Sequence, residues 1–109
     1  MVAMNDIQAV VDRIAAAYDP ERIVLFGSHA RGTATSDSDV DLLVILAFEG
    51  KPFWKSLEIT NRVNPPFAVD LLARRPDDTQ RRYAQGDPLI REALDRGRVL
   101  YERRRARVD

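Results

Sequence analysis

The chain is organised around GSHARGTATSDSDVD, residues 27–41, a polar connection between two short apolar runs. It is preceded by VLF and followed by LLVIL. Both runs are rich in β-branched or aromatic residues and are bounded by turn-forming residues, which is typical of buried strands. We therefore predict strands over residues 22–26 and 39–47, with a short helical turn over residues 28–32 between them.

Two carboxylates lie close together in this pattern. Because side chains alternate along a strand, Asp39 and Asp41 share a face with Leu43 and Ile45. Two such charges ~4 Å apart repel by about 4 kcal/mol at an effective dielectric constant of roughly 20. Mg²⁺, which takes one or two carboxylates together with phosphate oxygens, supplies a counter-charge. The alternative is that the two acids belong to the solvent-exposed face of an amphipathic strand and that the preceding Gly-Ser pair only forms a turn.

A family resemblance is carried by the same residues. Gly27-Ser28, ten further residues and then Asp39-Val40-Asp41 are similar to the signature of the DNA-polymerase-β nucleotidyltransferase superfamily. The fuller pattern GSHARG…SDSDVDLLV resembles the minimal (MNT-type) branch, and the likeness continues to residues 97–102. This resemblance implies the nucleotidyltransferase fold: a single α/β (α+β) domain over residues 1–109, with a small mixed β-sheet flanked by helices.

The resemblance implies a catalytic centre of three carboxylates, Asp39, Asp41 and Asp70, which would hold two Mg²⁺ ions. Asp70 is also unusual by itself, because it is a charge within the apolar run FAVDLL, residues 67–72, which we predict to be a central strand. A charged residue in such a strand is rarely left unpaired. The structural alternative for Asp70 is therefore an ion pair with Arg31 or Arg74.

A nucleotide site follows from the same likeness. The residues implied for binding ATP are Gly27, Ser28, Arg31 and, as a further candidate, Ser38. Arg31 could instead pair with Asp37 or Asp39, and Ser38 could simply bond local backbone, as serine in a turn ordinarily does. His29 is predicted to be a surface residue of the turn, with proton transfer as the alternative.

Capping signals predict two helices outside this region. Asn5 begins a capping box, which predicts a helix that ends near Tyr18. Proline at the first helical position predicts a second helix over residues 52–63. Phe53 and Trp54 of that helix are expected to face the core, as aromatic residues usually do, with exposure to a partner as the alternative.

Turn-forming residues divide the C-terminal third of the chain. We predict a short helix over residues 77–85 and a second one that begins after Asp87 as its N-cap. Gly97 is expected to close that helix in the left-handed conformation. An edge strand over residues 98–102 and a frayed basic tail, residues 103–109, would complete the domain. Contact of the tail with RNA or an acidic partner is the alternative.

Amino-acid composition and charge exclude several classes of function. The chain has no cysteine, and no apolar run approaches the ~20 residues of a membrane span. We expect a cytoplasmic protein without a signal peptide or membrane contact. Residues 1–70 carry 6 basic and 10 acidic groups and residues 71–109 carry 11 and 7, so net charges of −4 and +4 cancel. A neutral chain with an acidic site half makes nucleic acid an unlikely direct substrate.

The resemblance implies phosphoryl transfer from ATP to a hydroxyl. Its leading form is a protein adenylyltransferase that transfers AMP to a tyrosine of a HEPN-type toxin, and so acts as the antitoxin of a type VII-like pair. The alternatives are nucleotidylation of a small hydroxyl compound such as an aminoglycoside, and a non-catalytic module that neutralises a toxin by contact. The protein would form a homo-oligomer or a hetero-oligomer with the toxin. The Walker pattern of P-loop proteins is absent from the sequence.

Overall fold

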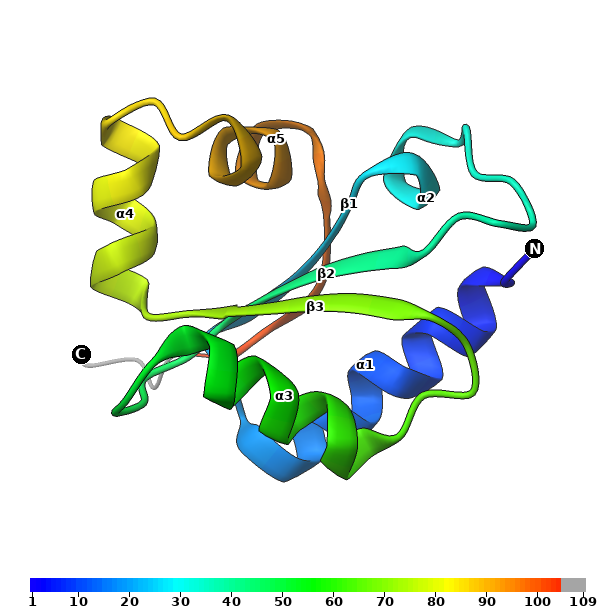
Figure 1. Ribbon diagram of the computed structural model, residues 1–109, viewed down its shortest axis with the longest axis horizontal. Helices are drawn as coiled ribbons and strands as arrows, with labels where there is room; N and C mark the ends of the chain where they lie inside the picture. The colour runs from blue at the N-terminus through cyan, green and yellow to red at the C-terminus, as the bar shows by residue number, and fades with distance from the viewer. Residues whose placement is uncertain (105–109) are drawn as a thin grey trace.

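Four strands form one sheet in the computed structural model, which describes residues 1–104 (Figure 1). The elements in chain order are α1 (Met4–Tyr18), β1 (Arg22–Phe26), α2 (Ser28–Arg31), β2 (Val40–Ile45), α3 (Pro52–Val63), β3 (Val69–Arg74), α4 (Pro76–Ala84), α5 (Pro88–Arg96) and β4 (Arg98–Glu102). The strand order in the sheet is β3-β2-β1-β4.

The sheet is mixed. β1 pairs antiparallel with both β2 and β4, whereas β2 pairs parallel with β3. A parallel pair needs a crossover between its strands, and α3 supplies it. The predicted mixed sheet flanked by helices is therefore confirmed. The predicted strand over residues 39–47 is shorter in the structure, and that over residues 67–72 begins two residues later.

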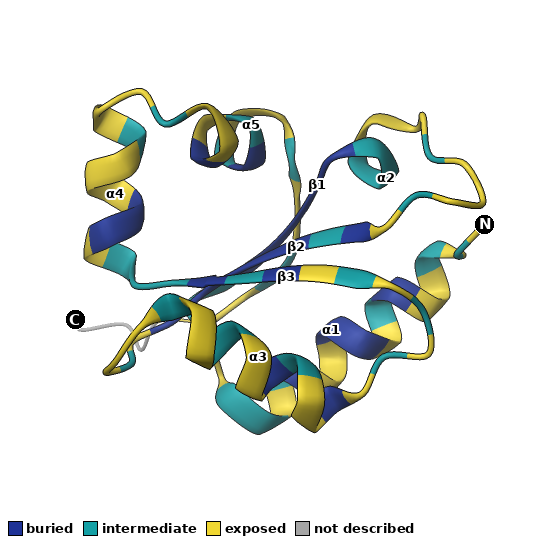
Figure 2. Ribbon diagram, viewed as in Figure 1, coloured by how far each residue is buried: buried dark blue, intermediate teal, exposed yellow. Residues whose placement is uncertain are grey.

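Each face of the sheet has its own apolar cluster. α1 and α3 cover one face, and α4 and α5 lie on the other (Figure 1). The α1 stripe of apolar residues at helical spacing is fully buried: Ile7, Val10, Val11 and Ile14. Alternation along β2 sends Leu42 to this cluster and Leu43 to the cluster beneath α5, which also contains Ile90 and Ala93. Both are fully buried, so β2 is covered on both sides (Figure 2).

Gly97 is extended rather than left-handed, with φ −78° and ψ 175°. A Cβ there would lie 2.2 Å from the carbonyl oxygen of Ala93 and 2.8 Å from that of Leu25. Glycine is therefore required because the chain passes against β1 as it leaves α5. The expected left-handed helix end was wrong, because a close tertiary approach and a helix C-cap both select glycine.

The beginning of α1 also differs from the prediction. The N-cap is Ala3 without a side-chain cap, so the expected capping box at Asn5 was wrong. Gln8, its expected partner, donates instead to Asp12 Oδ1 at 2.9 Å and to the carbonyl of Leu100 at 3.3 Å. Met4 packs against the core cluster, and the helix begins two residues earlier than a cap at Asn5 predicts. The Asp87 cap was correct: its side chain accepts from two backbone N–H groups of α5.

The expectation that Phe53 and Trp54 face the core was wrong. Their exposed fractions are 66% and 62%. α3 turns its Ile59 and Val63 to the core, and Ser56, on the same stripe, contacts β3 through its hydroxyl. The C-terminal half of α3 therefore determines which face of the helix packs against the sheet. The rings of Phe53 and Trp54 lie off that face and are exposed to solvent.

The C-terminal strand β4 lies at one edge of the sheet, as predicted. Arg103 is held beyond it, because its N–H donates to the carbonyl of Glu21 at 3.0 Å. The predicted frayed tail is therefore wrong for Arg103, and residues 105–109 lie outside the described part of the chain. Within residues 1–104, no helix combines the length and apolar character that crossing a bilayer demands.

Candidate active site

Asp41 and Asp70 lie directly opposite each other on the parallel strands β2 and β3. Residues in register share a face of the sheet, and for Asp41 this is the face of Leu43 and Ile45, beneath α5. Asp39 immediately precedes β2, two residues from Asp41, and is exposed. Two strands far apart in the chain thus bring the three predicted acids to one end of the sheet.

β3 is an edge strand, so the prediction of a central strand for Asp70 was wrong. Its apolar residues Leu71 and Ala73 are buried on the opposite face, which explains the apolar sequence without a second neighbouring strand. Asp70 is exposed. Among the described ion pairs, neither Arg31 nor Arg74 pairs with Asp70, so its structural alternative is not observed.

Gly27 lets the turn after β1 approach Asp41. It has φ 74° and ψ −154°, a conformation that is essentially restricted to glycine. A Cβ at this position would lie 2.1 Å from Oδ2 of Asp41. The carboxylate of Asp41 therefore lies against the backbone at the beginning of α2, next to Ser28. Gly27 of the Gly-Ser pair and the second acid of the Asp-Val-Asp motif are therefore in direct proximity.

The electrostatics of the site centre on Asp41. Burial raises the pKa of its carboxyl, and the neighbouring charges of Asp70 and Asp39 raise it further. Glu92 of α5 acts in the same direction more weakly, whereas His29 opposes the shift. Three other acids thus act on Asp41, and this region holds a concentration of negative charge that a cation would offset.

The donor chemistry fits a hard divalent cation, since carboxylate oxygens are the ligands that Mg²⁺ prefers. Within residues 1–104, however, no three or more His, Cys, Asp or Glu side chains are arranged as a ready-made metal site. Mg²⁺ commonly uses one or two carboxylates together with substrate phosphates rather than an all-protein cage. Asp39, Asp41 and Asp70 could hold such an ion only with further oxygens from a ligand.

Two contacts near the site were not foreseen. His29, predicted to be a surface residue, is half-buried, and its Nδ1 lies 3.1 Å from the carbonyl oxygen of Asp39. It therefore joins α2 to the residue before β2. Glu92 forms an ion pair with Arg31, at 2.6 Å between Oε1 and Nη1. No local sequence pattern distinguished Glu92, because its contact with Arg31 depends on how α5 packs over β1.

The remaining candidates have structural partners. Arg31 pairs with Glu92, and its alternative pairing with Asp37 or Asp39 is not observed among the described ion pairs. Ser38 Oγ accepts a hydrogen bond from the N–H of Thr35 at 2.9 Å, which is the ordinary local role expected in a turn. Neither contact excludes a ligand, because the side chain of Arg31 is 45% exposed and Ser38 is only partly buried.

Comparison with known proteins gives a family. The family model described as "Nucleotidyltransferase domain" matches residues 7–100. Comparison with curated proteins found no match. Among solved structures, a protein from Sulfolobus solfataricus assigned as a nucleotidyltransferase has a TM-score of 0.64 and 20% identity, over 91% of this chain and 79% of that one.

Two further structures are a toxin–antitoxin with AMP-PNP and a mutant of the toxin–antitoxin MntA-HpeT. Each has a TM-score of 0.55 and 19% identity, over 87% of this chain and 73% of the other. At these identities the likeness establishes the fold. The family model covers most of the chain, and its match agrees with the Gly-Ser turn and the acids gathered at the end of β2 and β3. The chain belongs to the nucleotidyltransferase domain family.

Proposed function

We propose that this protein is a Mg²⁺-dependent adenylyltransferase that transfers AMP from ATP to a tyrosine hydroxyl of a HEPN-type toxin, and so acts as an antitoxin. The observation that carries the proposal is the register of β2 and β3, which sets Asp41 opposite Asp70, beside the turn that begins with Gly27. The raised pKa of Asp41 supports a role in binding cations, because the repulsion behind the shift is relieved by positive charge.

The structural neighbours support the toxin–antitoxin part of the proposal. One was determined as a toxin–antitoxin with AMP-PNP, an ATP analogue, and another as a toxin–antitoxin mutant. The ATP, the tyrosine and the HEPN class of partner come from the resemblance of the GSHARG…SDSDVD pattern to the minimal branch of the superfamily.

The proposed reaction forms a bond between the acceptor oxygen and the α-phosphorus and breaks the bond to the β-phosphate, so pyrophosphate leaves. Bound divalent ions would stabilise the attacking and departing oxygens. Asp39 and Asp41 would hold them together with the triphosphate, and Asp70 would also accept the proton of the attacking hydroxyl. Gly27 and Ser28 would seat the phosphates through their backbone and through the Ser28 hydroxyl.

Arg31 would have to exchange partners in this scheme. Its guanidinium pairs with Glu92 in the structure, at 2.6 Å. Phosphate oxygens are strong acceptors for a guanidinium, so a bound triphosphate would compete with the carboxylate. Arg31→Lys should therefore weaken ATP binding, because an ammonium group cannot form the two parallel hydrogen bonds that a guanidinium can form with a phosphate.

The acceptor is tested by incubating the protein with labelled ATP, Mg²⁺ and the product of the neighbouring gene. Label on a tyrosine of that product is expected, and Asp70→Asn should abolish the label while ATP still raises the melting temperature. Label on an aminoglycoside instead would favour the small-molecule alternative. Neutralisation of the toxin without label, in wild type and Asp70→Asn alike, would favour the non-catalytic module.

A matched pair of glycines tests the site. Gly27→Ala should abolish ATP binding, because the new methyl group would occupy the position of the Asp41 carboxylate. Gly50 has a similar positive φ, 86°, but a Cβ there would meet nothing within 4 Å. Gly50→Ala thus carries the backbone strain without the collision, and should bind ATP normally. Calorimetric titration with ATP and Mg²⁺ distinguishes them, and equal loss in both variants would contradict the site assignment.

A further inference from the structure

The outer side of β3 is open along part of its length. In a parallel pair, alternate residues direct both backbone groups toward the neighbouring strand, and the others direct theirs away from it. The carbonyl of Arg74 accepts from the N–H of Leu46, so it points toward β2. Ala73, the residue before it, therefore points outward, and Val69 and Leu71 share its orientation.

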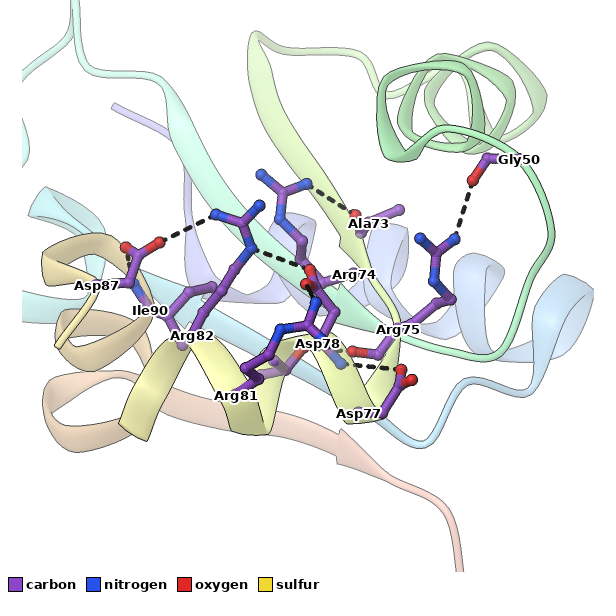
Figure 3. Close-up of polar contacts among 11 residues, drawn as sticks. Gly50, Ala73, Arg74, Arg75, Asp77, Asp78, Arg81, Arg82, Asp87 and Ile90 are labelled. Carbon is purple, nitrogen blue, oxygen red and sulfur yellow. Dashed lines mark hydrogen bonds and ion pairs between the residues drawn. The ribbon is translucent and has the colours of Figure 1, made fainter. Parts of the chain in front are cut away.

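The outward groups of Ala73 are already satisfied. Its N–H donates to Oγ of Ser56 on α3 at 2.9 Å. Its carbonyl accepts from Nη1 of Arg74, also at 2.9 Å (Figure 3). Within residues 1–104, Val69 and Leu71 have no such partners on the outer side. Four backbone groups of an edge strand are thus free to pair with another chain.

A groove of about 490 Å³ runs along this edge. Phe53 and Leu57 of α3 line one side, and the β3 residues Asp70 and Arg74, with Arg82 of α4, line the other. The predicted catalytic residue Asp70 thus also lines the groove. A segment bound in the groove would lie beside the residue at which AMP would be transferred.

Apolar surface flanks the groove. Phe53 and Trp54 pack edge to face, with ring centroids 5.0 Å apart, and Leu57 is 42% exposed. α3 therefore presents an exposed apolar band beside β3 (Figure 2). Aromatic residues in this position are typical of protein interfaces.

The charge of the groove changes along its length. Asp70 is at one end, and Arg74 and Arg82 are at the other. Arg82 is paired with Asp78 and Asp87, whereas the described contact of Arg74 is to a backbone carbonyl (Figure 3). In the described part of the chain Arg74 makes no ion pair with a carboxylate, so this end favours an acidic group of a partner.

We propose that an extended segment of the acceptor protein docks along β3 as a fifth strand. This docking mode rests on the proposed adenylyl transfer and describes how the acceptor is bound. The segment bonds the free backbone groups of Val69 and Leu71, covers Phe53 and Leu57, and places a carboxylate at Arg74 and a hydroxyl at Asp70. Strand addition of this kind gives affinity through the main chain and specificity through alternate side chains.

The spacing of β3 sets the pattern of the segment. Asp70 and Arg74 are four residues apart on one face, with Leu72 between them. A strand alongside therefore places its hydroxyl and acidic residues four apart, with an apolar residue between them on the same face. The two intervening residues turn to the other face, toward α3, and should be apolar.

The probe is a synthetic peptide with tyrosine, three valines and glutamate in succession, flanked by polar residues. Trp54 is the only tryptophan of the chain, so its fluorescence reports coverage of the apolar band. We expect a shift to shorter wavelength on titration, and transfer of AMP to the tyrosine with ATP and Mg²⁺. Lysine in place of glutamate, or N-methylation of the amides that face β3, should weaken binding about tenfold.

Variants of the protein test the same contacts. Phe53→Ala should weaken peptide binding about tenfold, and Arg74→Glu should reverse the preference so that the lysine peptide binds better. The matched control is Val99→Ala, which removes an apolar side chain that is 52% exposed on β4, at the opposite edge of the sheet. It should bind both peptides as the wild type does.

The outcomes separate this inference from the proposed function. Peptide binding without AMP transfer would support the docking surface and count against the adenylyltransferase. Transfer to the neighbouring gene product that is unaffected by Phe53→Ala and Arg74→Glu would overturn the docking surface alone. An equal shift of Trp54 fluorescence with oligouridylate, abolished by Arg74→Glu, would also overturn it, since the groove would then bind RNA.

Discussion

The face of the sheet under α1 and α3 differs from the face under α4 and α5. In the described part of the chain, the first buries fourteen apolar residues in one cluster and the second buries six. The second face also carries Asp41 and Asp70 at the end of its strands. One face thus supplies most of the apolar burial, and this allows the other to hold carboxylates close together, which reduces stability there.

The largest expected effect is a difference in the free energy of unfolding between core substitutions on the two faces. Leu42 and Leu43 are adjacent on β2, and both are fully buried, but in different clusters. Leu42→Ala should lower the free energy of unfolding by about 4 kcal/mol and Leu43→Ala by about 2 to 3 kcal/mol, because the smaller cluster can relax around the cavity. Urea unfolding measures both. Equal losses would show that the two clusters are equally rigid.

The next effect concerns the passage from α5 to the sheet. Gly97→Ala should cost about 2 to 3 kcal/mol, because the methyl group would collide with two backbone carbonyls that cannot move independently. Gly86 is the control: its φ is 85° and nothing lies within 4 Å of a Cβ there. Gly86→Ala should cost about 1 kcal/mol from backbone strain alone. If the two losses are equal, α5 can shift away from β1.

A smaller effect comes from the cap of α5. Asp87 accepts hydrogen bonds from the N–H groups of Leu89 and Ile90, and chiefly the bond from Ile90 lowers the pKa of its carboxyl. Asp87→Ala should cost about 1 kcal/mol at neutral pH. A pKa lower in the folded than in the unfolded protein gives stability above pH about 4, which is lost as the pH falls through the folded pKa.

The pH dependence of this loss provides its check. The difference in free energy of unfolding between wild type and Asp87→Ala should shrink in urea melts below pH about 4. Asp87→Asn, which retains a capping oxygen without the charge, should be less sensitive to acid. A difference that stays constant with pH would mean that the carboxylate charge does not contribute to the cap.

The smallest effect should be a gain. Asp41→Asn removes a partly buried charge whose pKa is raised by burial and by Asp70 and Asp39. At neutral pH the metal-free variant should melt at the wild-type temperature or slightly above it, and ATP with Mg²⁺ should no longer raise that temperature. Asp39→Asn, at an exposed position, should behave in the same way. Melting well below wild type without ligand would make Asp41 a structural residue.

Local sequence patterns were sufficient for most elements. Apolar residues at helical spacing predicted α1, proline at the first helical position predicted α3, and short apolar runs between turn-forming residues predicted the strands on either side of the Gly-Ser turn, because each of these signals is local. The Asp-Val-Asp spacing placed two acids on one face, since strand alternation is a local property. Asp87 was readable as a cap because its hydrogen bonds reach only to the next turn.

Packing between distant segments determined the rest. The register of β2 with β3, the place of β3 at the edge, the approach of Gly97 to β1 and the pair between Arg31 and Glu92 all join segments far apart in the chain. Each depends on how layers fit together, and residue spacing carries no information about that. Phe53 and Trp54 show the same limit of local sequence patterns. Their hydrophobicity favours burial, but it does not determine whether this chain or a partner chain buries them.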